Sequence, residues 1–249
     1  MSIPKPSTMA PVSSGPIPPF VVGFILSLGV SLTARMLRWL TTNGAIAAVL
    51  VGTLVFASGG WARAGLLVLF VTSSSILTRW QASRKPHPEH AAGRSAAQVL
   101  ANGAVATVLS AYGVLHPAPW ATVAFAGAIA ASTADTWATE IGLLSKTPPR
   151  LITAGMRRRH ATVSPGTSGG VTWLGAIAAC TGSAVIAGMS TMWLGTPLAP
   201  VWAGGVFGMA LDSLLGATVE GRSRWMTNDA VNLLATVGGA TCAAWLTRW

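Results

Sequence analysis

Residues 120–142 read WATVAFAGAIAASTADTWATEIG, an apolar run that ends in a segment with two carboxylates, Asp135 and Glu140. It belongs to one of eight stretches long enough to cross a bilayer, since a transmembrane helix needs roughly 20 mostly apolar residues. The eight stretches are 18–34, 42–59, 61–78, 96–115, 120–143, 171–193, 198–219 and 228–247. They are long and rich in Ala, Gly and Leu, unlike the short alternating strands of a transmembrane barrel. The sequence therefore predicts an all-α fold, a polytopic membrane helix bundle of about eight transmembrane helices.

The composition agrees with a lipid environment. Hydrophobic residues make up 51% of the 249 residues and charged residues only 9%, which excludes an ordinary soluble domain. Residues 1–17 are rich in Pro and Ser and lack the apolar core of a secretory signal. We therefore expect a short tail at 1–17 followed by a single transmembrane domain at 18–249.

The basic residues predict an orientation. A net charge of +10 would indicate nucleic acid in a soluble protein, but here all Lys and Arg except Lys5, Arg63 and Arg248 fall in the first, third, fifth and seventh connections. The positive-inside rule places these connections in the cytoplasm and both termini outside. The expected partner is thus a lipid bilayer and not nucleic acid, in the plasma membrane of a prokaryote or in an organelle membrane. The short turn at 59–61 leaves a re-entrant hairpin open.

Two stretches begin alike, with NGAIAAVL at 43–50 and NGAVATVL at 102–109, and a Trp follows each at the same offset. Such similarity is typical of membrane folds built from repeated helix pairs. Chance is an equally good explanation, because segments rich in Ala and Gly match one another easily. A repeat of helix pairs therefore stays one of two interpretations.

The six acidic residues fall in four short segments, two of which are expected transmembrane helices. A carboxylate near a helix centre costs about 2.5 to 3.5 kcal/mol on insertion, so Asp135 and Asp212 indicate a shared site. Glu140 points about 140° away from Asp135 on a straight helix. Together with Asp229, which follows Asn228 at the start of the last stretch, the two aspartates offer the oxygen ligands that suit Mg²⁺. The competing interpretations are internal ion pairs or hydrogen bonds for the aspartates and a helix cap at Asp229.

A glycine-rich segment, SPGTSGGVT at 164–172, precedes the sixth stretch. Glycines let backbone amides converge, hydroxyls add donors, and the N-terminus of a helix carries partial positive charge, so the segment favours an anion such as phosphate. A simple turn with a helix cap is the competing interpretation. The residues expected to bind substrate or phosphate are Gly166, Thr167, Ser168, Gly169, Gly170, Asn228, Arg84, Lys85, Arg94, Arg157, Arg158 and Arg159.

Five blocks of the sequence resemble the transmembrane protein 19 family, which includes the plant phytyl-phosphate kinases. They are QVLANG at 98–103, ADTWATEIG at 134–142, PGTSGGVT at 165–172, LDSLLGAT at 211–218 and TNDAVNLL at 227–234, and the likeness runs through about residues 40–245. The resemblance implies a membrane kinase that moves a phosphoryl group from a nucleoside triphosphate, with CTP as a candidate, to an isoprenyl monophosphate such as phytyl phosphate. QVLANG is closer to the general branch of the family than to the plant kinases. The resemblance therefore supports the class of reaction more strongly than the identity of the substrate.

Carboxylates, a phosphate cradle and basic loops at one face are the ingredients of phosphoryl-group handling. In this hypothesis Asp135, Asp212 and Glu140 are catalytic, and Mg²⁺ is held by Asp135, Asp212 and Asp229. The alternative hypothesis is a transporter or flippase of a phosphorylated lipid or another anion, which also explains intramembrane carboxylates and Gly-rich helix ends. Turnover of a nucleoside triphosphate distinguishes the two.

Overall fold

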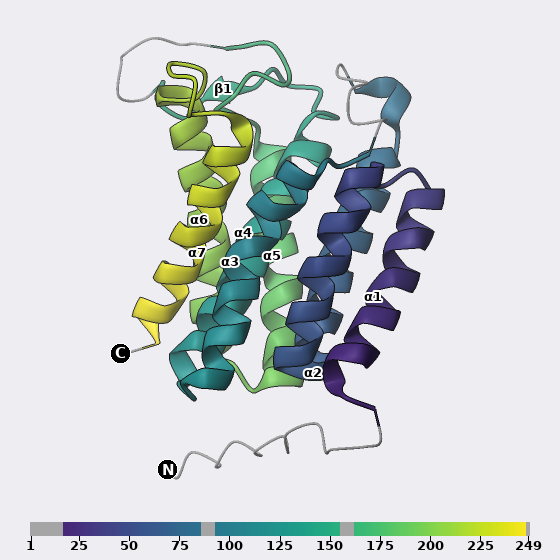
Figure 1. The fold of residues 1–249 in the computed structure, drawn as a ribbon. Coiled ribbons are helices and arrows are strands. Elements are labelled where there is room, and N and C mark those ends of the chain that lie inside the picture. The colour runs from purple at the N-terminus through teal and green to yellow at the C-terminus, as the bar shows by residue number, and fades with distance from the viewer. Residues whose placement is uncertain (1–16, 86–92, 155–161, 248–249) are drawn as a thin grey trace.

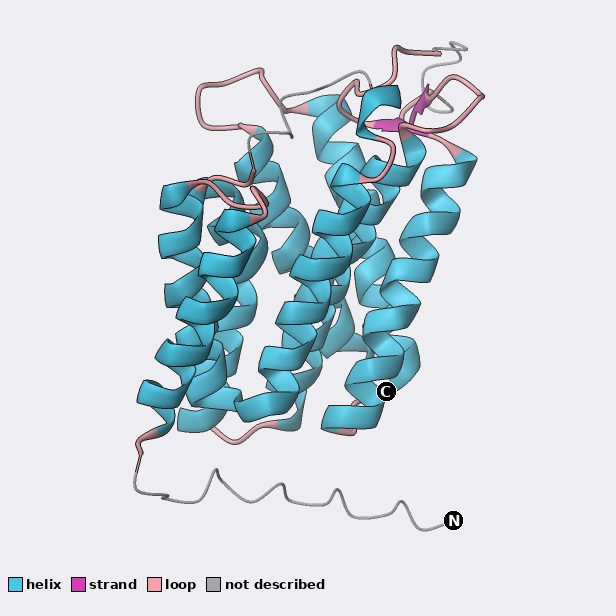
Figure 2. Ribbon diagram, turned by 90° about the vertical axis from the view of Figure 1, so that its right-hand side faces the viewer, coloured by secondary structure: helices cyan, strands magenta, loops and turns pink. Residues whose placement is uncertain are grey.

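The structure is a computed structural model that describes residues 17–85, 93–154 and 162–247. Within these ranges it contains seven α-helices, one 3₁₀ turn and one pair of two-residue strands, and the long helices run side by side (Figures 1 and 2). The elements are α1 Pro19–Met36, α2 Thr42–Arg79, η1 Ala82–Arg84, α3 Ala96–Leu115, α4 Pro119–Gly142, β1 Arg150–Leu151, β2 Gly170–Val171, α5 Trp173–Leu194, α6 Leu198–Thr218 and α7 Asn228–Leu246. The prediction of an all-α membrane bundle is confirmed.

Helix α2 is a hairpin of two antiparallel arms. Gly60 has φ 62° and ψ −157°, a conformation that reverses the chain and that glycine adopts without a steric penalty. At the far end of the hairpin, Arg79 Nη2 donates to the carbonyl of Arg38, just after α1 (2.6 Å). Near the turn, Arg63 Nη1 donates to the carbonyl of Ser110 in the last turns of α3 (2.9 Å). The two stretches predicted at 42–59 and 61–78 are therefore the two arms of one element.

Helix α4 occupies the middle of the bundle, where it contacts α2, α3, α5, α6 and α7. Nearly all of its residues from 121 to 134 are buried, so its apolar run faces protein instead of lipid. Five helices of the described chain, α1, α2, α3, α5 and α6, are long and apolar enough to span a bilayer. The more polar α4 and α7 lie beside them in the same bundle.

Glycines bring α4, α6 and α7 into close contact. A Cβ atom on Gly239 of α7 would lie 2.9 Å from the carbonyl oxygen of Gly204 in α6 and 3.1 Å from that of Gly127 in α4. A Cβ atom on Gly208 of α6 would overlap Ala131 of α4. Small residues allow helix backbones to approach in this way when lipid supplies no hydrophobic drive for association. The contact of Gly208 with Ala131 lies one turn before Asp212 and one turn before Asp135.

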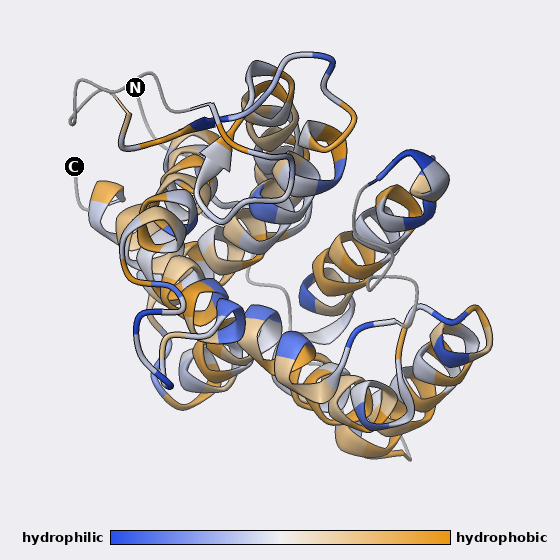
Figure 3. Cartoon of the chain, turned by 90° about the horizontal axis from the view of Figure 1, so that it is seen from above, coloured by the Kyte–Doolittle hydropathy of each residue, from blue (hydrophilic) through white to orange (hydrophobic). Residues whose placement is uncertain are grey.

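The connections rich in basic residues gather at one end of the bundle, which we call the loop end. It comprises the described parts of 37–41, 80–95, 143–172 and 219–227, together with the β1–β2 pair (Figures 1 and 2). Seen from this end, the strongly hydrophilic residues lie mainly on the connections and the helix ends, while the helices carry hydrophobic residues (Figure 3). Helix α1 begins and α7 ends at the opposite end (Figure 1). The cytoplasmic location of the loop end stays a prediction.

Candidate functional site

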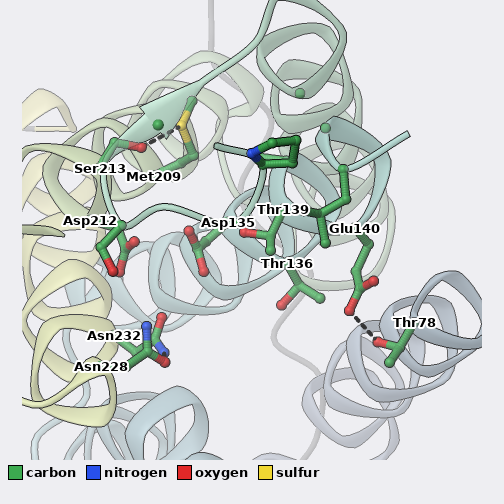
Figure 4. Close-up of a pocket in the computed structure, with 18 of the residues that line it drawn as sticks. Thr78, Asp135, Thr136, Thr139, Glu140, Met209, Asp212, Ser213, Asn228 and Asn232 are labelled. Carbon is green, nitrogen blue, oxygen red and sulfur yellow. Dashed lines mark hydrogen bonds between the residues drawn. The ribbon is translucent and has the colours of Figure 1, made fainter. Parts of the chain in front are cut away.

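A cavity of about 360 Å³ opens at the loop end and collects most of the polar residues of the helix ends. Figure 4 shows that its labelled side chains come from α2, α4, α6 and α7 and point toward a common space. The residues with polar or glycine character that line it include Arg38, Ser75, Thr78, Arg79, Arg94, Gln98, Asn102, Asp135, Thr136, Thr139, Glu140, Asp212, Ser213, Glu220, Asn228, Asn232 and residues 166–170.

Asp135 of α4 and Asp212 of α6 lie across from each other in this cavity (Figure 4). Their carboxyl groups are close enough to interact directly, and the charge of Glu220 acts on both. Asp212 Oδ1 is buried and has no hydrogen-bond partner among the described residues. A buried carboxylate oxygen without a donor costs free energy, and a like charge beside it adds to that cost. The donor chemistry of the two carboxyl groups therefore suits a cation.

The donor chemistry at this place fits Mg²⁺. The described residues contain no set of three Asp, Glu, His or Cys side chains arranged to hold a metal. However, Mg²⁺ is usually held by one or two carboxylates together with waters and substrate phosphates. Asp135 and Asp212 are two such ligands, and the unpartnered Oδ1 of Asp212 supplies a free acceptor. Asp229 does not line the cavity, so its role as a ligand remains a prediction.

The glycine-rich segment forms one wall of the cavity and rests on the last turns of α6. Gly166 and Gly169 have φ of 85° and 76°, the left-handed region that favours glycine. A Cβ atom on Gly169 would lie 2.6 Å from the carbonyl oxygen of Ser213, so the loop approaches α6 one residue after Asp212. Strand β2 then pairs with β1, and Thr172 caps α5 by accepting from the amide of Gly175 (3.0 Å).

Backbone amides of this wall remain available to a ligand. The amides of Thr167 and Gly170 donate to carbonyls within the segment, at 3.1 and 2.9 Å. The amides of Gly166, Ser168 and Gly169 have no acceptor among the described residues. Free amides that converge near a helix N-terminus form an anion-binding concavity. The wall therefore has the chemistry of the predicted phosphate cradle.

Glu140 belongs to a different environment from Asp135 although both are on α4. Its carboxylate accepts from Thr78 Oγ1 and from Lys85 Nζ, each at 2.7 Å (Figure 4 draws the first contact). Lys85 also donates to the carbonyls of Leu77 (2.6 Å) and Thr78 (3.3 Å) at the end of α2. The side chains of this ion pair are only 5% and 6% exposed. Glu140 and Lys85 thus neutralise each other and join α2 to α4.

A cationic wall faces the carboxylates. Arg94 lies over the ring of Phe70, 5.6 Å from its centroid, and its guanidinium has no hydrogen bond to another described residue. Burial lowers the pKa of Arg94 from its ordinary value, and the charge of Glu140 acts in the opposite direction. An arginine keeps its proton even so, and Arg94, Arg38 and Arg79 all line the cavity. Guanidinium groups bind phosphate and carboxylate through strong, often paired hydrogen bonds.

Comparisons with known proteins show which family the chain belongs to. The model of a family described as integral membrane protein DUF92 matches residues 25–240, a range that includes every residue lining the cavity. The chain belongs to this family. An uncharacterized membrane protein of Methanocaldococcus jannaschii is 30% identical over 88% of this chain and 90% of its own length. Protein PGR of Arabidopsis thaliana is 30% identical over 80% of this chain and 78% of its own. No solved structure shows significant similarity.

Membership in the DUF92 family confirms the resemblance drawn from the five sequence blocks. In this family member the structure brings together the predicted residues Asp135, Asp212, Glu140, Arg94, Asn228 and 166–170 around one cavity. Lys85 reaches the site only through Glu140, and Arg84 donates to Gln81 Oε1 (3.2 Å) outside the lining. Arg157, Arg158 and Arg159 lie outside the described residues.

Several lining residues were not predicted from the sequence. Glu220 was not among the residues expected to act at the site, yet it accepts from Ser168 Oγ (3.0 Å) and its charge acts on both aspartates. Arg38 and Arg79 were interpreted only as signals of orientation. Asn232 carried a usable signal, because it lies one helical turn after Asn228 and donates to Asn228 Oδ1 (3.1 Å).

Proposed function

We propose that this DUF92 protein is a membrane kinase that transfers the terminal phosphoryl group of a nucleoside triphosphate to an isoprenyl monophosphate. The observation that carries the proposal is the pair of facing carboxylates, Asp135 and Asp212, with an unpartnered buried oxygen, in a cavity whose other walls are free amides and guanidinium groups. Carboxylates alone would repel phosphate. A cation between the two carboxylates and a polyphosphate removes this repulsion.

The two phosphate groups have separate places in this proposal. The triphosphate lies between the glycine-rich wall and the two aspartates, where the amides of Gly166, Ser168 and Gly169 donate to its oxygens. The acceptor phosphate lies on the cationic wall, where Arg94 contributes its unused donors. The space between the walls is where the two phosphates meet in line. Positioning of this kind supplies most of the catalysis in phosphoryl transfer.

The chemistry needs little from the protein beyond this. An oxygen of the isoprenyl monophosphate forms a bond to the terminal phosphorus, the bond from that phosphorus to its bridging oxygen breaks, and a nucleoside diphosphate leaves. The attacking phosphate is already ionised, so no side chain has to remove a proton from it. Mg²⁺, when bound at Asp135 and Asp212, supplies charge neutralisation for the phosphate oxygens. The guanidinium groups stabilise the charge that develops on the transferred group.

The test is a direct assay. The purified protein in detergent is incubated with Mg²⁺, each nucleoside triphosphate in turn, and phytyl or geranylgeranyl monophosphate, and the diphosphate product is measured by mass spectrometry. We expect product with at least one donor and none with Asp135→Asn. His116→Ala, at the opposite end of the bundle, is the matched control and should leave the rate unchanged.

Transport of a phosphorylated lipid is the competing function, and the same assay separates the two. If folded protein forms no diphosphate with any donor, the kinase proposal fails. Movement of a labelled isoprenyl phosphate between the leaflets of protein-containing vesicles without nucleotide consumption would then support the transporter.

A further inference from the structure

A second cavity, of about 650 Å³, lies on the lipid side of α3, α4 and α7, and we call it the α3–α7 groove. Its lining is almost entirely apolar, and the hydroxyl of its Thr241 is already donated to the carbonyl of Val237 (2.8 Å). Val108 and Val237, on opposite sides of the groove, are both exposed. The groove is therefore open sideways to the hydrocarbon of the membrane and offers no polar recognition of its own.

Along both α3 and α7, the lining of the groove begins where the lining of the polar cavity ends. Along α3, Asn102 lines the polar cavity, and Ala104 and Val105 line the groove. Along α7, Asn232 lines the polar cavity and the next residue, Leu233, lines the groove. Both helices thus pass from an amide-bearing residue to an apolar wall within a single turn. A ligand that occupied both cavities would be an amphiphile with its polar head at the loop end.

The length of the groove indicates how long a lipid chain it can hold. Its lining on α7 runs from Leu233 to Trp245, which corresponds to about 18 Å at 1.5 Å per residue. This is close to one leaflet, since the whole hydrocarbon core is about 30 Å thick. Trp120 and Trp245, at the end away from the loops, form its far boundary. A flexible chain about one leaflet long therefore fits between the amides and the two indoles.

We propose that the α3–α7 groove holds the isoprenyl tail of the acceptor while its phosphate lies in the polar cavity. This inference rests on the proposed function, and it names the surface through which the lipid substrate reaches the site from the membrane. A chain lying in the groove gains binding free energy with each buried carbon, so the groove selects for long tails. The two tryptophans set the upper limit of the chain that is buried completely.

A photoaffinity experiment tests the groove without relying on turnover. Geranylgeranyl monophosphate carrying a diazirine near the end of its tail is irradiated with the protein in nanodiscs, and the labelled peptides are mapped by mass spectrometry. We expect the label on α7 and the start of α4, near Trp245 and Trp120. Label on α1 or α5 would overturn the inference, and so would equal labelling of the groove by a diazirine phosphatidylcholine, which would make it an ordinary lipid contact.

Two matched variants sharpen the test. Val237→Trp fills the groove from a position that is 44% exposed, and Leu234→Trp changes a position on the same helix that is 42% exposed and lies outside the groove. Val237→Trp should lower labelling about tenfold, because excluding two or three buried CH₂ groups costs that much in affinity. Leu234→Trp should not change it, and equal effects of the two variants would remove the groove from consideration.

Kinetics separates this inference from the kinase proposal. Val237→Trp should raise the KM for geranylgeranyl monophosphate about tenfold, for the same reason, and leave kcat and the turnover of short dimethylallyl monophosphate unchanged. A wild-type protein that labels in the groove but turns over neither substrate would refute the kinase and keep the lipid groove. Turnover of both substrates with no effect of Val237→Trp would keep the kinase and refute the groove.

Discussion

Asp135 and Glu140 lie five residues apart on α4, and they differ in the groups that surround their carboxylates. Glu140 is paired with Lys85 and accepts from Thr78, so both of its oxygens are used. Asp135 faces Asp212, a second acidic group, and has no ion-pair partner among the described residues. A carboxylate with an ion-pair partner in the protein stabilises the fold. A buried acidic group without such a partner is a candidate for binding a ligand. From this comparison we propose that Glu140 stabilises the fold and that Asp135 takes part in the chemistry.

The largest effect that we expect is on stability, at the paired carboxylate. Glu140→Gln should lower the free energy of unfolding by about 3 to 5 kcal/mol, because it leaves the buried Lys85 without its counter-charge. Thermal unfolding in detergent, followed by circular dichroism, measures this. The double variant with Lys85→Met should recover much of the loss. Loss of turnover in Glu140→Gln at an unchanged melting temperature would instead make Glu140 catalytic and break the comparison.

The unpaired carboxylates should give the opposite pattern. Asp212→Asn should reduce turnover by about 10² to 10³-fold, the usual cost of one electrostatic contact in a transition state. The same change should not lower the melting temperature, since it replaces a buried carboxyl group whose Oδ1 has no hydrogen-bond partner among the described residues. Added Mg²⁺ should stabilise the wild type and not the variant. A variant less stable than the wild type would show that Asp212 is held by protein contacts after all.

The cationic wall is the next test. Arg94→Gln should raise the KM for the isoprenyl phosphate by about 10 to 100-fold, since a hydrogen bond to a charged group is worth roughly 1.5 to 3 kcal/mol. Steady-state kinetics at constant nucleotide measures it. Arg84→Gln is the matched control, because Arg84 lies outside the cavity and donates to Gln81. Equal effects of the two changes would mean that the general positive charge of the loop end, and not Arg94, binds the phosphate.

The smallest effect concerns the spacing of the two aspartates. Gly208→Val should cost about 1 to 3 kcal/mol of stability, because a side chain there overlaps Ala131 and separates α6 from α4. Turnover should fall further than stability predicts, since Asp212 and Asp135 would move apart. Gly188→Val on α5 is the control, as a Cβ atom there meets nothing within 4 Å. Thermal unfolding and product formation on the same preparations decide between the two.

Much of this arrangement could be predicted from the sequence, for a physical reason. Apolar length identifies spanning helices, and the high cost of a charge in lipid makes Asp135 and Asp212 conspicuous. The helical angle showed that Asp135 and Glu140 point in different directions, although both were predicted to be catalytic. The pairing of Glu140 with Lys85 could not be predicted, because it joins a loop to a helix 55 residues later in the chain, and no local pattern encodes such a contact.

Asp229 shows a second limit of prediction from the sequence. The motif suggested a third metal ligand, yet Asn228 and Asn232 line the cavity and Asp229 does not. Asn228 and Asn232 share a face of α7 because they are one turn apart, whereas Asp229 lies about 100° from Asn228 around the helix. Residue type alone favoured the carboxylate, whereas helix geometry favoured its neighbours.

Arg63 has a consequence for how the protein is made. Its guanidinium donates to the carbonyl of Ser110 at 2.9 Å and to Thr122 Oγ1 at 2.9 Å, and it lies 5.5 Å from the ring centre of Phe125. All three partners are synthesised dozens of residues after the α2 hairpin. Until α3 and the start of α4 have been synthesised, the guanidinium of Arg63 at the tip of the hairpin lacks these protein acceptors and must keep its hydrogen bonds to water. The membrane assembly of the N-terminal half is therefore complete only when α4 arrives.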